Sequence, residues 1–182
     1  MHGQKWVVNL ILTKLEIIKN YRKKRLKIEP FDINLLNPNS YNYRLGNELL
    51  EFDECIDARK KSKVNKIVLT EAGYVLKPNK LYLAATYESI GSDKFVTQLI
   101  GRSSIGRLGL FLQVTAPIGH VGTYHNWTLE LKTVQPLRVY PYMKIGQVSF
   151  WKIKGNKDIN YLNGEYKQYK LPQISKFYKE LK

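Results

Sequence analysis

The sequence contains one cysteine and three histidines in 182 residues. The single thiol, Cys55, cannot form an intramolecular disulfide, which excludes a disulfide-stapled domain and fits a reducing compartment. The same scarcity excludes classical structural zinc sites and the cysteine pair of zinc-dependent base deaminases. We therefore expect a cytoplasmic protein whose chemistry uses no catalytic zinc.

Long apolar runs are also absent. No segment approaches the roughly 18 apolar residues that would span a bilayer. The stretch over residues 6–12 is short, interrupted by asparagine and without a small-residue cleavage site, which argues against a secretory signal. We expect this stretch to be a strand or an extended arm, and we expect no membrane partner.

Acidic residues are half as numerous as basic ones, 15 against 30, and the formal net charge is +15. Such a balance favours anionic partners, namely nucleotide phosphates, nucleic acid or an anionic surface. The basic residues cluster over residues 14–27 and again over the lysine-rich segment 152–182. Charge runs are usually solvated faces, so a nucleic-acid-binding module is an alternative rather than the leading interpretation.

The hydrophobic pattern predicts a mainly β protein. Thr13 and Glu16 have the spacing of a capping box, and apolar residues at helical spacing after them predict a short helix over 14–24. Short apolar runs of strand length then follow, separated by turn residues. These runs are 66–69, 73–76, 81–86, 95–100, 110–115, 127–133, 137–140 and 145–151. They predict one antiparallel sandwich or barrel domain over 1–182, with an arm and helix in 1–30 and a tail in 155–182.

One stretch does not fit an ordinary core. "GRSSIGRLGL" (101–110) places two arginines and two serines between apolar runs. Four further stretches accompany it in order: "LKIEPFDINLLNPNSYNYRLGNELLEF", "GYVLKPNKLYLAATYESI", "WTLELKTVQPLRVYPYMKIGQVSF" and a looser tail, "NGEYKQYKLPQISKFYKE". Together, over about residues 10–180, they resemble the dCTP deaminase branch of the dUTPase superfamily. The resemblance implies a distorted antiparallel β-barrel (β-clip), homotrimers, and sites built from two or more subunits.

The resemblance also implies a reaction, the hydrolytic deamination of a cytosine nucleotide, most simply dCTP to dUTP and ammonia. A carboxylate must move the proton of the attacking water, and the motif "LEL" assigns this role to Glu130. By similarity Ser103 holds the water, Arg107 orients that network, and Mg²⁺ accompanies the triphosphate. On the residues alone, a glutamate paired on a strand face is the better-supported interpretation of Glu130, and the face of the strand on which it lies is left open.

Substrate contacts are implied for a larger set. Arg102 and Ser104 offer donors to phosphate oxygens. Backbone groups after the Val-Thr-Ala strand would read the base. Gln147 would lie near the nucleotide, although a structural role is almost as well supported. The predicted contacts are Arg102, Ser104, Ala116, Pro117, Ile118, His120, Gln147, Tyr161, Tyr166, Gln168 and Lys170. The last four stand in the tail, where the family has a motif that binds the triphosphate and this sequence matches it poorly.

Two positions depart from the family pattern. His120 occupies the place of an aspartate that dUTPases and bifunctional members need for triphosphate hydrolysis. We therefore expect dUTP as the product, with diphosphate release lost or very weak. A dUTPase-like diphosphohydrolase and a non-catalytic nucleotide-binding or nucleic-acid-binding protein remain the alternatives. Asn42 replaces a second common aspartate in "SYNYRLG".

Overall fold

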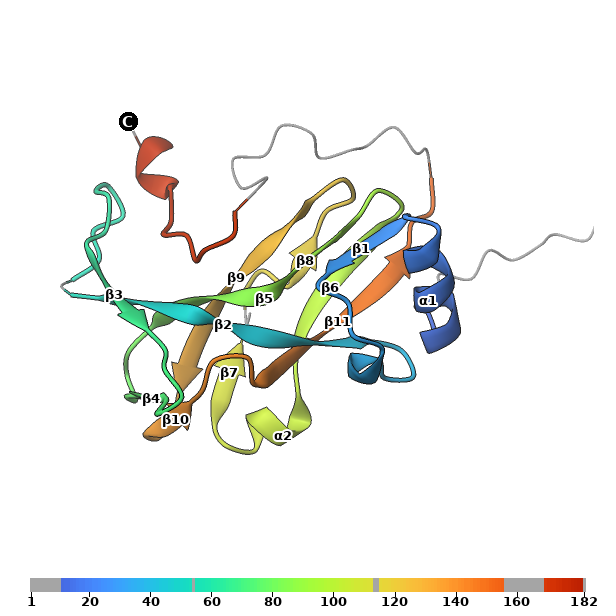
Figure 1. Ribbon diagram of the computed structural model, residues 1–182. Coiled ribbons are helices and arrows are strands. Elements are labelled where there is room, and N and C mark those ends of the chain that lie inside the picture. Colours follow the sequence, from blue (N-terminus) through green and yellow to red (C-terminus); the bar gives the residue numbers. More distant parts are fainter. Residues whose placement is uncertain (1–10, 54, 113–114, 156–168, 182) are drawn as a thin grey trace, which may run out of the picture.

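The computed structural model describes residues 11–53, 55–112, 115–155 and 169–181. Strands dominate these ranges, and Figure 1 shows them curling as one antiparallel sheet with a short helix at one end. The predicted mainly β class is confirmed. No helix in the described ranges is long and apolar enough to cross a bilayer.

Helix α1 (Lys14–Arg22) confirms the helix predicted near the N-terminus, although it begins differently. Thr13 makes no side-chain cap hydrogen bond. Glu16 instead accepts hydrogen bonds from Lys19 Nζ at 3.0 Å and Asn20 Nδ2 at 3.3 Å. The predicted capping box is therefore wrong, because the Glu16 carboxylate accepts hydrogen bonds from two side chains in the next turn of the helix instead of from the backbone at Thr13. Ile17 is fully buried and anchors the helix on the sheet.

The remaining elements follow in chain order, and most coincide with predicted runs. Strands β1, β2 and β8 were not among those runs, although Tyr41, Tyr43 and Leu45 of β2 alternate with polar residues, and β5 and β9 are longer than predicted. The bounds are β1 (Leu26–Glu29), η1 (Ile33–Leu35), β2 (Tyr41–Phe52), β3 (Val64–Val68), β4 (Tyr74–Leu76), β5 (Tyr82–Ser92), β6 (Phe95–Gly101), α2 (Ser103–Gly106), β7 (Leu110–Leu112), β8 (Ile118–Gly119), β9 (Tyr124–Thr133), β10 (Leu137–Val139), β11 (Lys144–Lys152) and η2 (Phe177–Lys179).

The main sheet has the order β7-β9-β5-β2-β11-β6-β8, with β1 added to β5 and β3 added to β2. Every described strand pair in it is antiparallel. Strands β4 and β10 form a separate two-stranded sheet. Strands β6 and β9 lie near opposite ends of this order. The motif "GRSSIGRLGL" at the end of β6 and the motif "LEL" on β9 are therefore on strands that are not neighbours in the sheet.

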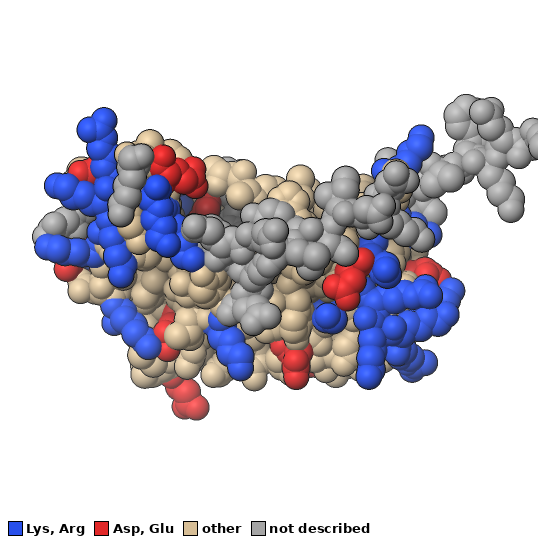
Figure 2. Space-filling model, turned by 90° about the horizontal axis from the view of Figure 1, so that it is seen from above, with Lys and Arg blue, Asp and Glu red and all other residues tan. Residues whose placement is uncertain are grey.

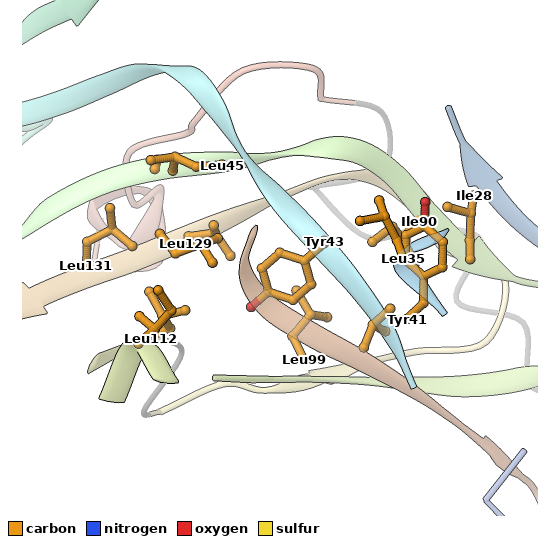
Figure 3. Packing of buried hydrophobic residues seen from close by; sticks show 14 of the residues in the cluster. Ile28, Leu35, Tyr41, Tyr43, Leu45, Ile90, Leu99, Leu112, Leu129 and Leu131 are labelled. Atoms are coloured by element: carbon orange, nitrogen blue, oxygen red, sulfur yellow. The ribbon is translucent and has the colours of Figure 1, made fainter. Parts of the chain in front are cut away.

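The hydrophobic core fills the concave side of the curled sheet. Figure 3 shows Leu129 and Leu131 of β9 pointing toward Leu45 and Tyr43 of β2. All four are fully buried. This arrangement answers the question that the sequence left open: the two leucines flanking Glu130 face the core, so Glu130 faces away from it.

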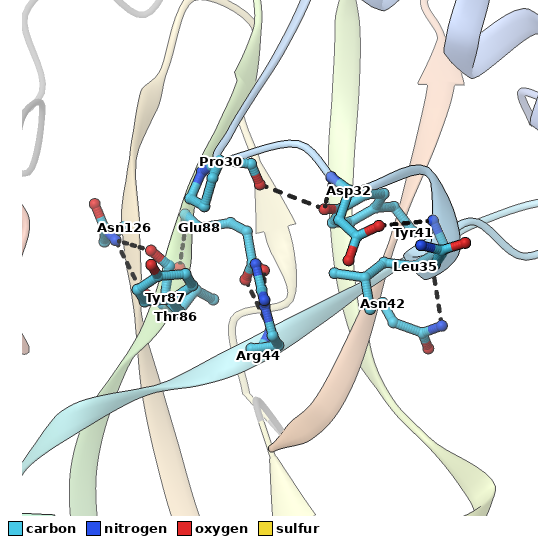
Figure 4. A network of polar contacts seen from close by, with 11 residues as sticks. Pro30, Asp32, Leu35, Tyr41, Asn42, Arg44, Thr86, Tyr87, Glu88 and Asn126 are labelled. Carbon is cyan, nitrogen blue, oxygen red and sulfur yellow. Dashed lines mark hydrogen bonds and ion pairs between the residues drawn. The ribbon is translucent and has the colours of Figure 1, made fainter. Parts of the chain in front are cut away.

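A buried ion pair stabilises the middle of the sheet. The register of β5 shifts between Ala85 and Ser89, and Glu88 in this irregular stretch is completely buried. Its carboxylate accepts from Arg44 Nε at 2.6 Å and from the Arg44 backbone N–H at 2.8 Å (Figure 4). Asn126 of β9 holds the same stretch by donating from Nδ2 to the Thr86 carbonyl at 2.8 Å. The irregularity is therefore a fixed part of the fold.

Glu88→Ala tests this ion pair. Burial raises the pKa of Glu88, although Arg44 opposes the rise. The contribution of this titration to the free energy of unfolding is therefore fully present below the ordinary glutamate pKa and is lost as pH rises through the raised pKa.

At neutral pH, Glu88→Ala leaves buried donors of Arg44 without an acceptor, and we expect a loss of about 3 kcal/mol in urea unfolding. The control is Glu48→Ala, which removes only a pair with the exposed Lys66 and should cost about 0.5 kcal/mol. Equal losses would contradict this account.

Basic side chains gather at the two ends of the face shown in Figure 2. Exposed basic residues include Lys14, Lys19, Arg22, Lys23, Lys24 and Arg25 on α1 and the turn after it, which form a first group, and Lys60, Lys61 and Lys63 between β2 and β3. The first group confirms the basic cluster predicted around residues 14–27.

Candidate functional site

A cavity of about 560 Å³ lies against β9, which places it in the size range of small-molecule sites. Its walls come from β9, the start of β5, the chain on either side of β8, the segment after β2, and the tail. Much of its lining is apolar, including Leu81, Leu83 and Trp127. Such a lining suits a flat ring with a few polar contacts.

Glu130 projects into this cavity from the centre of β9. Its neighbours Leu129 and Leu131 are buried on the opposite face, so strand alternation alone directs its carboxylate into the cavity. Thr115 Oγ1 donates a hydrogen bond to Glu130 Oε2 at 3.0 Å. Sequence reasoning did not single out the Thr115 side chain, although it precedes the predicted base-reading segment by one residue.

The predicted base-reading segment lies partly in the cavity. Ala116 and Ile118 line it together with Glu130. Pro117 does not line it, and its carbonyl is occupied by a hydrogen bond from the Leu99 N–H at 2.8 Å. His120 is exposed and lines the same cavity at the position of the expected aspartate.

Other lining residues of β9 were not predicted. Thr128 lines the cavity on the face of Glu130, as alternation indicates, and the preceding residues His125, Asn126 and Trp127 line it as well. His125 and Trp127 form an edge-to-face ring pair with centroids 4.2 Å apart. Trp127 Nε1 donates to the Ile90 carbonyl at 3.0 Å, which fixes the indole at the cavity wall.

The tail covers one side of the cavity. The Tyr169 carbonyl accepts from the Asn126 N–H at 2.9 Å, and the Gln173 N–H donates to Thr128 Oγ1 at 3.1 Å. Tyr169 and Gln173 both line the cavity. Lys170 lies between them but lines a separate cavity of about 200 Å³. The predicted contacts Tyr161, Tyr166 and Gln168 lie outside the described residues.

The motif "GRSSIGRLGL" lies elsewhere in the same chain. It forms the end of β6, the short helix α2 and the turn after it, at the lower edge of the molecule in Figure 1. None of Arg102, Ser103, Ser104 and Arg107 lines the cavity that contains Glu130. Arg102 Nη1 donates to the Lys144 carbonyl at 3.0 Å, whereas Ser103 and Arg107 are exposed. One copy of the chain therefore does not bring the predicted catalytic residues together.

Gln147 is also absent from the cavity lining. Its Oε1 accepts from Asn37 Nδ2 at 3.0 Å and from Ser40 Oγ at 2.6 Å. Its Nε2 donates to the Gly101 carbonyl at 3.4 Å. These contacts match the structural alternative weighed for Gln147 more closely than direct nucleotide contact.

The described residues contain no group of three histidine, cysteine or carboxylate side chains that could hold a metal ion. Among the described lining residues of the main cavity, Glu130 is the acidic one. The cavity can therefore supply one carboxylate for proton transfer.

Comparisons with known proteins identify the family of this chain. Residues 11–153 match the family model described as dCTP deaminase-like. A dCTP deaminase, dUMP-forming, from Hathewaya histolytica is 45% identical over 172 residues, which cover 94% of this chain and 99% of that protein. A protein of the same name from Clostridium acetobutylicum is 45% identical over 164 residues, covering 90% of this chain and 94% of that protein.

A solved structure shares the fold at lower sequence similarity. The 2'-deoxycytidine 5'-triphosphate deaminase from Agrobacterium tumefaciens superposes with a TM-score of 0.65 at 20% identity. The match covers 79% of this chain and 48% of that one, so the chain spans about half the length of that protein. The extent of the family match and the identity to full-length relatives show that the chain is an enzyme of the dCTP deaminase-like family.

Proposed function

We propose that the protein deaminates dCTP and releases dUMP as the final product. The observation that carries this proposal is the 45% identity, over nearly the full length of both chains, to proteins named dCTP deaminase, dUMP-forming. The Glu130 cavity supports the first step, because it combines an apolar wall with one carboxylate. The dUMP product replaces the dUTP expected from the sequence.

The deamination step needs one proton relay. Water adds to C4 of the cytosine ring while Glu130 takes one of its protons and passes it to N3. Glu130 then carries the remaining hydroxyl proton to the amino group, which leaves as ammonia and leaves a C4 carbonyl. The balance is dCTP plus water giving dUTP plus ammonia. Thr115 supports this step by holding Glu130 Oε2 at 3.0 Å, which restricts the carboxylate to one orientation at the cavity wall.

A neighbouring copy of the chain completes the site in this proposal. Ser103 and Arg107 are exposed, and their side chains have no hydrogen-bond or ion-pair partner among the described residues. Exposed apolar side chains flank them in the sequence: Ile100, Leu108 and Phe111 are 40%, 44% and 48% exposed. Such a rim suits an intersubunit contact, and in a closed homotrimer α2 of each copy would face the Glu130 cavity of the next.

The second hydrolysis converts dUTP and water to dUMP and diphosphate. We propose that Mg²⁺ enters with the triphosphate, coordinated by phosphate oxygens and water, and neutralises charge on the leaving diphosphate. Arg102, Ser103 and Ser104 of the neighbouring copy would contribute donors to the phosphates. One observation favours a second candidate, in which the reaction stops at dUTP: His120 lines the cavity where the family carries an aspartate.

Product chromatography distinguishes the two candidates. Purified protein with dCTP and Mg²⁺ should yield dUMP, diphosphate and ammonia in equal amounts, with little free dUTP. Accumulation of dUTP would support the second candidate. In that case His120→Asp should restore diphosphate release by about 100-fold, the usual effect of a positioned general base, whereas His120→Asn should not. Loss of phosphate with the 4-amino group retained would contradict both candidates.

A further inference from the structure

Three side-chain amides form a directed hydrogen-bond chain across neighbouring strands. Asn42 Nδ2 donates to Asn37 Oδ1 at 3.1 Å, and Asn37 Nδ2 donates to Gln147 Oε1 at 3.0 Å. Gln147 Nε2 then donates to the Gly101 carbonyl at 3.4 Å. Gln147 lies opposite Asn42 on β2 and opposite Ile100 on β6, so the chain crosses β11 between them. We name Asn42, Asn37 and Gln147 the amide relay.

Two further contacts fix the direction of the amide relay. Asn42 Nδ2 also donates to the Leu35 carbonyl at 3.1 Å (Figure 4), so the amino group of Asn42 faces both this carbonyl and Asn37. Ser40 Oγ accepts from Asn37 Nδ2 at 3.1 Å and donates to Gln147 Oε1 at 2.6 Å, so in this arrangement the carbonyl end of Gln147 faces the turn after η1. Asn42 and Ser40 are only 5% and 7% exposed. With those ends occupied, the donor end of Gln147 points toward Gly101.

We propose that the amide relay positions the segment that carries Ser103 and Arg107, through the Gly101 carbonyl. The peptide between Gly101 and Arg102 is planar, so a fixed carbonyl also fixes the direction of the Arg102 N–H. That peptide leads directly into α2, whose Ile105 and Gly106 amides bond back to the Arg102 carbonyl at 2.9 and 2.8 Å. Gln147 is thus a positioning residue. This inference rests on the role proposed above for Ser103 and Arg107.

The direction of the relay depends on asparagine at position 42. A carboxylate there has no donor, so Asn37 would have to turn its amino group toward it. Gln147 would then present Nε2 to Asn37 and Oε1 to the Gly101 carbonyl, which sets two acceptors against each other. The Leu35 carbonyl would lose its donor as well. The aspartate common at this position in the family would therefore reverse the relay in this chain.

Two variants test the relay, with a matched control. Asn42→Asp reverses it, and Gln147→Glu keeps the acceptor for Ser40 but removes the donor to Gly101. Asn39→Asp is the control, because it adds the same charge to the same turn at an exposed residue outside the relay. In the free protein, we expect amide hydrogen exchange at Ile105, Gly106 and Arg107 to be about tenfold faster in both test variants and unchanged in the control.

Kinetics add a second measurement. A loop that is correctly placed in only part of the population raises the apparent KM while saturating substrate restores the rate. We expect KM for dCTP to rise about tenfold and kcat to stay within about twofold. Unchanged exchange in Gln147→Glu would overturn the relay, and this variant decides the matter if Asn42→Asp does not fold. Because exchange is measured without substrate, absence of deamination in the wild type would overturn the proposed function and leave the relay standing.

Discussion

Glu130→Gln should lower kcat for dCTP deamination by about 1,000-fold or more, within the range measured for loss of a general acid–base group. Glutamine has nearly the same shape, and its carbonyl can still accept from Thr115 Oγ1, as Glu130 does at 3.0 Å. It cannot take a proton from water at neutral pH. The change therefore removes the proton relay while leaving the cavity wall intact.

Nucleotide binding separates this result from misfolding. We expect calorimetric titration with dCTP to give a Kd within about threefold of wild type, because the base still meets the same wall. Glu71→Gln, at an exposed residue outside the cavity, is the matched control and should be fully active. Normal turnover by Glu130→Gln would show that the proton relay lies elsewhere.

The single variants Ser103→Ala and Glu130→Gln should each be inactive alone, whereas oligomers assembled from a mixture of the two variants should be active. If each site takes Glu130 from one copy and Ser103 from the next, a mixed oligomer contains some interfaces with both native residues. A working site needs a Ser103→Ala chain in the copy that supplies Glu130 and a Glu130→Gln chain in the copy that supplies Ser103. In a closed ring mixed at random from equal amounts, each condition is met with a chance of about one half, so about one quarter of the wild-type activity should return. Ammonia release after the two variants are unfolded and refolded together measures this recovery.

The unmixed variants, refolded separately and then combined, are the control and should stay inactive on the time scale of the assay. Recovery near zero in the co-refolded sample would place Glu130 and Ser103 of a working site in the same chain. In that case the separation of α2 from the Glu130 cavity would have to be closed by a large movement within one copy. The proposal of a site shared between copies draws its support from the exposure of α2 and of the apolar side chains Ile100, Leu108 and Phe111.

Much of the fold follows from local sequence features. Most of the predicted apolar runs became strands because β-branched and aromatic residues alternate with polar ones over strand lengths. The orientation of Glu130 needed one more fact, namely which face of β9 is buried. Burial of Leu129 and Leu131 supplied it, and the same alternation indicates Thr128, but not the lining by three consecutive residues before it.

Other features depend on contacts between distant parts of the chain. The covering of the cavity by Tyr169 and Gln173 depends on hydrogen bonds to β9, which no local pattern records. Gln147 was predicted as a possible substrate contact, yet its amide is occupied by residues more than 40 positions away. The capping box failed because nearby lysine and asparagine donors compete for Glu16, a competition that spacing alone does not resolve.

Proton transfer by Glu130 during deamination is tested directly with dCTP labelled with ¹⁵N at its exocyclic amine. We expect labelled ammonium to appear in the NMR spectrum at the rate at which dCTP disappears, and we expect Glu130→Gln to abolish both. Loss of phosphate from dCTP with the label still attached to the pyrimidine ring would contradict this expectation.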